Sequence, residues 1–146
     1  MTDFGAPILH HARHEDGGAD ELDCAGLAGR HQYVDRGDPS NYDWVRTDLT
    51  TDGTWNDLDL SSIVPAGTVA VSINLIVTHV QTNMAVALRK KGNTNDINVL
   101  TAQTRVSMLS TRADGIVPCD ANRFVQYNGT NTTFIAITIL VRGWFV

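Results

Sequence analysis

The chain has 146 residues, 42% of them hydrophobic and 18% charged, which is enough for one domain with a buried core and too few for two. No apolar run approaches the roughly 20 residues of a membrane-spanning helix, so we expect no membrane insertion. The net charge of −5 is uneven, because residues 1–59 hold 13 acidic side chains against four arginines and residues 60–146 hold seven basic side chains against three aspartates. This asymmetry indicates either an acidic segment that meets a basic neighbour or an unevenly solvated surface.

Residues 1–42 show no sustained period of 2 or 3.6 and are interrupted by glycine and proline. Such a stretch buries too little apolar surface to offset its ordering entropy, so it predicts an extended docking arm and linker. Leu22 and Leu27 are its expected anchors, with a short helical turn near 19–22. The "DRGDPSNYD" stretch (35–43) is rich in turn formers and ends the predicted linker. The start lacks a secretion signal, so synthesis in the cytoplasm is expected.

From residue 43 onward the pattern predicts strands. "TWNDLDL" (54–60) is typical of an edge strand. Residues 68–80 alternate, and their apolar face carries Val69, Val71, Ile73, Leu75 and Val77. Further strands are expected near 83–91 and 97–109, with turns at "ADG" (113–115) and "NG" (128–129).

The last predicted strand is apolar on both faces. Ile135, Ile137, Ile139 and Val141 form one face, and the other carries Phe134, Leu140 and Trp144. A strand of this kind belongs in a sandwich interior or at a subunit contact. The spacing of strands and turns predicts an all-β, jelly-roll-like β-sandwich over residues 43–146, and the second apolar face predicts a homotrimer.

The histidines raise the question of a metal site, because His10 and His14 are four residues apart. The segment lacks helical periodicity, and a glycine pair follows, so solvated histidines beside carboxylates are the preferred interpretation. A shared site on a three-fold axis is the form of metal binding that stays open. We predict no metal and no cofactor.

Catalytic constellations are missing from the sequence. The carboxylates of residues 15–23 lie on a segment without a scaffold, and His79 is expected to be a hydrogen-bonded core or interface residue. No GxSxG, P-loop or GxGxxG motif occurs. Cys24 and Cys119 lack CxxC spacing and are expected to be free thiols. The sequence therefore predicts a protein that is not an enzyme.

Two further features concern ligands. The tryptophans Trp44, Trp55 and Trp144 are candidates for a sugar-stacking platform or for core and subunit-interface positions. The basic run at 89–91 has no interleaved aromatic residues, so we expect no nucleic-acid binding.

Two stretches resemble known proteins. "HARHEDGGADEL" (11–22 with His10 before it) resembles a segment near the N-termini of tailed-bacteriophage fibre and virion structural proteins, written HxxxHxxGGxDx[IL]. The matching residues are His10, His14, Gly17, Gly18, Asp20 and Leu22. "LRKKGNTNDINVL" (88–100) and "TFIAITILVRGWF" (133–145) resemble the small C-terminal β domain of phage proteins of that group.

The resemblance implies a non-enzymatic virion protein, a small trimeric decoration, head fibre or fibre knob, located in the virion and anchored to other virion proteins by its N-terminal arm. No heptads, collagen-like repeats or β-helical shaft separate the two stretches, which favours a compact form over a long fibre. The arm residues named above, with Leu27, are the predicted docking contacts. The alternative is a glycan-binding tail-tip adhesin or carbohydrate-binding module that recognises a host surface glycan.

Overall fold

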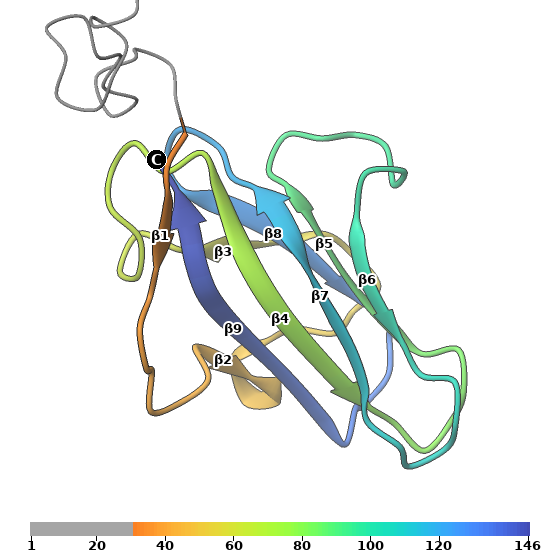
Figure 1. Ribbon diagram of the computed structural model, residues 1–146. Coiled ribbons are helices and arrows are strands. Elements are labelled where there is room, and N and C mark those ends of the chain that lie inside the picture. Colours follow the sequence, from red (N-terminus) through yellow and green to blue (C-terminus); the bar gives the residue numbers. More distant parts are fainter. Residues whose placement is uncertain (1–30) are drawn as a thin grey trace, which may run out of the picture. The chain divides into compact units, whose positions relative to one another are not determined.

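The computed structural model describes residues 31–146. Within these residues the chain forms nine β-strands and one 3-10 helix, and the strands make two antiparallel sheets that face each other (Figure 1). The prediction of an all-β sandwich is therefore confirmed. Residues 1–30 of the predicted arm, with its short helical turn, lie outside the described residues.

The two sheets differ in size. Sheet A has the order β1-β9-β4-β7, and β2 also pairs with β9. Its strands are β1 (Tyr33–Asp35), β2 (Trp44–Val45), β4 (Ala70–Thr78), β7 (Thr111–Pro118) and β9 (Ala136–Phe145). Sheet B has the order β3-β8-β5-β6. Its strands are β3 (Asn56–Asp59), β5 (Ala85–Lys90), β6 (Leu100–Gln103) and β8 (Phe124–Gly129), and the 3-10 helix η3 (Arg46–Asp48) follows β2.

The strand order is that of a jelly roll. When β1 and β2 are counted as one interrupted first strand, the order is 1-8-3-6 in sheet A and 2-7-4-5 in sheet B. The predicted jelly-roll-like topology is therefore confirmed. The edge-like character predicted for 54–60 is also confirmed, because β3 lies at the edge of sheet B.

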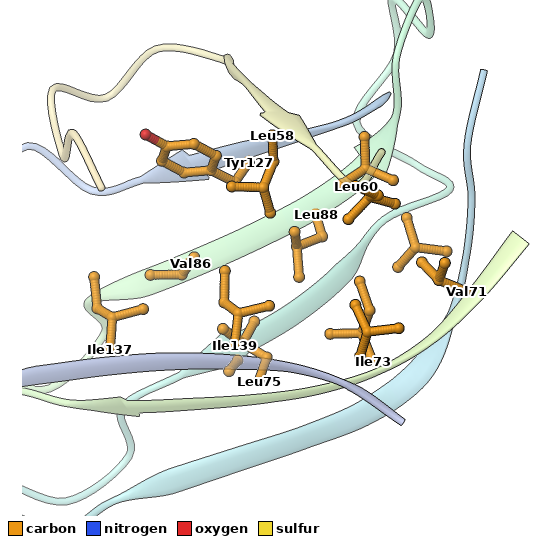
Figure 2. Packing of buried hydrophobic residues seen from close by; sticks show 14 of the residues in the cluster. Leu58, Leu60, Val71, Ile73, Leu75, Val86, Leu88, Tyr127, Ile137 and Ile139 are labelled. Atoms are coloured by element: carbon orange, nitrogen blue, oxygen red, sulfur yellow. The ribbon is translucent and has the colours of Figure 1, made fainter. Parts of the chain in front are cut away.

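The core fills the space between the two sheets, as Figure 2 shows for residues from both of them. It forms because alternate residues of each strand point to the same face. On β4, Val71, Ile73, Leu75 and Val77 are fully buried, as predicted. Val69 precedes β4 and is 39% exposed, so its predicted place in the inner row is wrong.

A β-bulge changes the inner face of β9. Ile73 pairs with Val141, whereas the preceding Ser72 pairs with Gly143, so Arg142 is an extra residue in β9. The bulge shifts the alternation by one position. Trp144 consequently shares the inner face with Val71 and packs against the core. The prediction that Trp144 lies on the face opposite Ile137, Ile139 and Val141 is wrong for this reason.

The sandwich begins earlier than the sequence indicated. Strand β1 pairs with the end of β9, and the compact unit runs from Gln32 to Val146. The loop after β1 is held to β9, because Arg36 forms an ion pair with Asp43 and donates a hydrogen bond to the carbonyl of Val141. The Asp43 carboxylate in turn accepts a hydrogen bond from the Val141 N–H over 2.7 Å. The predicted boundary at residue 42 is therefore corrected to residue 32.

Candidate functional site

The predicted docking residues all lie before the described part of the chain. They are His10, His14, Gly17, Gly18, Asp20, Leu22 and Leu27. Cys24 lies there as well. The proposals made for these positions stay predictions.

The three tryptophans do not form one platform. Trp44 pairs with Ile139 and packs against the core, as Trp144 does at the other end of β9. Trp55 directly precedes β3 and lies over the outer side of sheet B, where the Arg89 guanidinium stacks on its ring. Of the predicted glycan-binding aromatics, only Trp55 therefore faces a ligand-accessible surface.

His79 has a structural role. It is 2% exposed, and its Nδ1 accepts the backbone N–H of Gln81 at 2.9 Å. Because Nδ1 accepts, the neutral ring carries its proton on Nε2, which lies 3.1 Å from the hydroxyl of Thr132. The ring also packs edge-on against Phe134. Both ring nitrogens are engaged, which confirms the prediction of a hydrogen-bonded core histidine.

Cys119 is also structural. It is a buried free thiol whose Sγ lies 3.2 Å from the carbonyl oxygen of Thr68. Burial raises the pKa of this thiol, which disfavours the nucleophilic thiolate. The Cys119 side chain therefore acts as a small core residue.

The outer face of sheet B carries a shallow trough of about 260 Å³. Its position follows from Ala85 and Ala87, whose small side chains lie on the outer side of β5 between longer side chains of the neighbouring strands. The residues that line it are Trp55, Ala85, Ala87, Asp96, Val99, Thr101, Asn128 and Thr130. Small residues in the middle and polar groups around them make a concave surface on an otherwise flat sheet.

Arg89 fixes one wall of this trough. Its guanidinium carbon lies 3.9 Å from the centroid of the Trp55 ring. The same guanidinium donates hydrogen bonds to Gln126 at 3.2 Å and to Asp96 at 2.9 Å. Arg89 is only 8% exposed. Its guanidinium supports the indole ring, and its positive charge is paired with the Asp96 carboxylate.

A second ion pair lies on the same face. Lys91 Nζ is 2.6 Å from Asp57 Oδ2, and Gln126 donates to the other carboxylate oxygen. The bond from Lys91 lowers the pKa of Asp57 below its ordinary value. Two of the three cations in the 89–91 run are thus paired with aspartates, which weakens this run as a surface for polyanions.

The outer face of sheet A is of a different kind. It is rich in apolar side chains that are exposed or half-buried, and Tyr33 packs against Phe145 at its edge with ring centroids 5.2 Å apart. Its apolar members are Tyr33, Val45, Ala70, Ile76, Ile116, Pro118, Ala136, Leu140 and Phe145. Ile116 is 60% exposed. A hollow of about 390 Å³ lies beside Leu140 against the 39–42 loop.

A polar group interrupts this apolar face. Asp114 accepts hydrogen bonds from the Asn74 amide at 2.8 Å and from Arg142 at 3.2 Å. Arg112 lies beside Ile76, and Asp35 pairs with Gly143 at the β1 edge. The face therefore carries charges of both signs around an apolar surface.

Residues 31–146 lack a metal-ligand cluster and a membrane-spanning helix. No group of three or more histidine, cysteine, aspartate or glutamate side chains is placed to hold a metal ion there. In the same part of the chain, no helix has the length and apolar character that crossing a membrane requires.

Comparisons with protein-family models, with curated proteins and with solved structures find no match to this chain. The function must therefore be argued from the residues and the geometry of the chain itself. Sequence reasoning missed most of the trough and the outer row of sheet A. The alternation of small residues at Ala85 and Ala87 was a usable signal for the trough, but Asp96 and Asn128 reach it only through the fold.

Proposed function

We propose that this chain is a non-enzymatic structural protein of a tailed-bacteriophage particle, assembled in the host cytoplasm and displayed on the particle as a homotrimer. The resemblance of residues 10–22 to virion proteins supports the proposal. The start of the jelly roll at Gln32 also supports the proposal, because the motif at 10–22 and the sandwich are then separate stretches of the chain. An anchor followed by a displayed head requires such a division.

The observation that carries the trimer is the apolar outer face of sheet A. Ile116 and Val45 are exposed there, beside half-buried Leu140 and Phe145. Exposed apolar side chains gathered on the outer face of a sheet support a protein contact there. A second copy of the chain is the partner that fits, because Arg112 and Asp35 give the same face both charge signs. Copies packed around a three-fold axis would each shelter part of this face.

Within residues 31–146, the buried histidine and cysteine of the sandwich support a non-enzymatic role. His79 has both ring nitrogens in hydrogen bonds, and Cys119 is buried with its thiol against the Thr68 carbonyl. Neither group is free to reach a substrate. We therefore propose that the protein functions in binding and assembly.

Particle incorporation tests the proposal. The double variant Leu22→Asp, Leu27→Asp in the full chain should be lost from purified particles, because burying two leucines contributes roughly 3–6 kcal/mol of gross transfer free energy to docking. Its thermal unfolding should match that of the unaltered chain. Ile97→Asp, at a loop position that is 91% exposed, is the matched control and should be incorporated normally. Normal incorporation of the double variant, or failure of the unaltered chain to enter particles, would contradict the proposal.

A further inference from the structure

We propose that the trough on the outer face of sheet B binds a neutral saccharide, with one sugar ring against Trp55. This inference goes beyond the structural role proposed above and does not depend on it. It assigns the site to one face of the jelly roll and the ligand to one chemical class.

The shape of the trough limits the ligand to something small. Its volume of about 260 Å³ lies below the roughly 300–1,000 Å³ of pockets for drug-sized ligands. The floor is Ala85 and Ala87, and a pyranose ring can approach the strand closely over these methyl groups. The trough is open to solvent, so further rings of an oligosaccharide can extend beyond it.

Trp55 provides the apolar contact. Sugar rings present C–H groups on their faces, and an indole offers a large, rigid surface for them. The Arg89 guanidinium occupies one side of the Trp55 ring, while Trp55 and not Arg89 lines the trough. Arg89 therefore supports the indole from outside the site, and the bonds to Gln126 and Asp96 hold Arg89 itself in place. The aromatic wall is fixed before a ligand arrives, which lowers the entropic cost of binding.

The polar rim matches hydroxyl groups. Asn128 lines the trough, and its amide nitrogen donates to the Gly53 carbonyl at 3.2 Å, which leaves the amide oxygen available as an acceptor. The Thr101 hydroxyl lines the same space on an exposed strand position. Asp96 uses one carboxylate oxygen for Arg89 and keeps the second as an acceptor. Acceptors and hydroxyls around an indole are the groups that a polyhydroxylated ring requires.

The charge of the site selects a neutral ligand. The one charged lining residue is Asp96, and its charge is paired with Arg89 at 2.9 Å. No lysine, arginine or histidine lines the trough. A phosphate, sulfate or carboxylate group would therefore meet a carboxylate without gaining a cation. An uncharged hexose or N-acetylhexosamine has no such penalty.

The experiment is binding of the full chain to an array of neutral and anionic glycans, followed by titration of each neutral hit by ligand-detected NMR. We expect hits among neutral pyranose oligosaccharides, with affinities that change little with salt. Trp55→Ala should weaken the best hit about tenfold or more. Ala87→Leu fills the floor while Trp55 and Arg89 are both retained, and it should weaken binding of the best hit comparably.

Phe124→Ala is the matched control, since this aromatic residue lies on the same face under Lys91 but does not line the trough. Its affinity should be unchanged, and thermal unfolding should show that all three variants are folded. The proposal is overturned if no neutral glycan binds, if only anionic glycans bind, or if binding survives both trough variants. None of these results bears on particle incorporation, so this inference and the proposed structural role can fail separately.

Discussion

The outer faces of the two sheets differ although both sheets contribute the same kind of inner face. On sheet B, the outer face carries two ion pairs, Arg89 with Asp96 and Lys91 with Asp57. On sheet A, Ile116 and Val45 are exposed, and the main polar interruption is the hydrogen-bonded Asn74–Asp114–Arg142 group. An antiparallel sheet needs only one face in the core, so the second face is free to serve another purpose.

This difference supports the proposal that the two faces have different partners. Burial of a large apolar surface against another protein gives a favourable free energy, because water is removed from that area. Burying ion pairs against another protein gives little free energy, because the charges lose their hydration. A small concavity beside such pairs can instead stay in water and bind a hydroxylated ligand. We therefore assign sheet A to contacts between copies of the chain and sheet B to solvent and ligand.

The largest expected effect is on assembly. Ile116→Asp places a charge on the proposed contact, at a position that is 60% exposed, and should weaken association by about 2–4 kcal/mol, or some thirty- to thousandfold. Size-exclusion chromatography of the variant should show a monomer. The same change at Ile97, in a loop outside sheet A, should leave the elution volume unaltered. If both variants elute like the unaltered chain, the outer face of sheet A is not the contact.

The next effect is on the edge of sheet A. A Cβ atom at Gly143 would collide with the Tyr33 ring and with the Val34 backbone carbonyl. Gly143→Ala should therefore push β1 away from β9 and lower the free energy of unfolding by about 1–3 kcal/mol. Urea denaturation measures this loss. An unchanged midpoint would mean that β1 contributes little to the stability of the sandwich.

A smaller effect concerns the interior that both sheets share. Burial raises the pKa of the Cys119 thiol in the folded state, so the folded protein holds this proton to higher pH than the unfolded chain. Stability from this group is complete below the ordinary thiol pKa of 9.0 and is lost as the pH rises above it. Cys119→Ala should flatten the alkaline limb of a melting curve measured against pH. An identical limb in both proteins would contradict this account.

The smallest effect is on sheet B. The Lys91 ammonium lowers the pKa of Asp57, so this pair adds stability at neutral pH that is lost as the pH falls through the lowered pKa. Both side chains are exposed, so the gain is small and is screened by salt. Asp57→Asn should leave the melting temperature almost unchanged at high ionic strength. A large drop in the melting temperature at high ionic strength would show that the Asp57–Lys91 pair is important for the stability of the fold.

The sequence predicted the long strands because their alternation is local. It misplaced two turns, at 113–115 and 128–129, where glycine lies inside β7 and β8 instead. Gly115 is there because a Cβ atom would collide with Leu100, and Gly129 because one would collide with Thr51. Each glycine makes room for a residue distant in the chain. Such close approaches look the same as turn signals in a sequence.

Other features that the sequence did not predict also depend on pairing between residues that are distant in the chain. Strand β1 has three residues, too few for a period, and it exists because its partner is the end of β9. The bulge at Arg142 depends on the register with β4, and counting alternate residues from Ile137 therefore placed Trp144 on the wrong face. The residues that line the trough come from all four strands of sheet B or from the segments next to them. Of the trough residues, the sequence singled out only Trp55, as a candidate sugar-stacking residue, although the alternating alanines of β5 were a further usable signal.

The most direct test of the central claim, that the outer face of sheet A is covered by other copies of the chain, is the mass of the full chain in solution. Multi-angle light scattering across the micromolar range should give three times the monomer mass. Oxidative footprinting of the same sample should leave Ile116 and Leu140 protected, while Phe124 on sheet B reacts. A monomer mass, or equal reactivity of the two faces, would contradict the account.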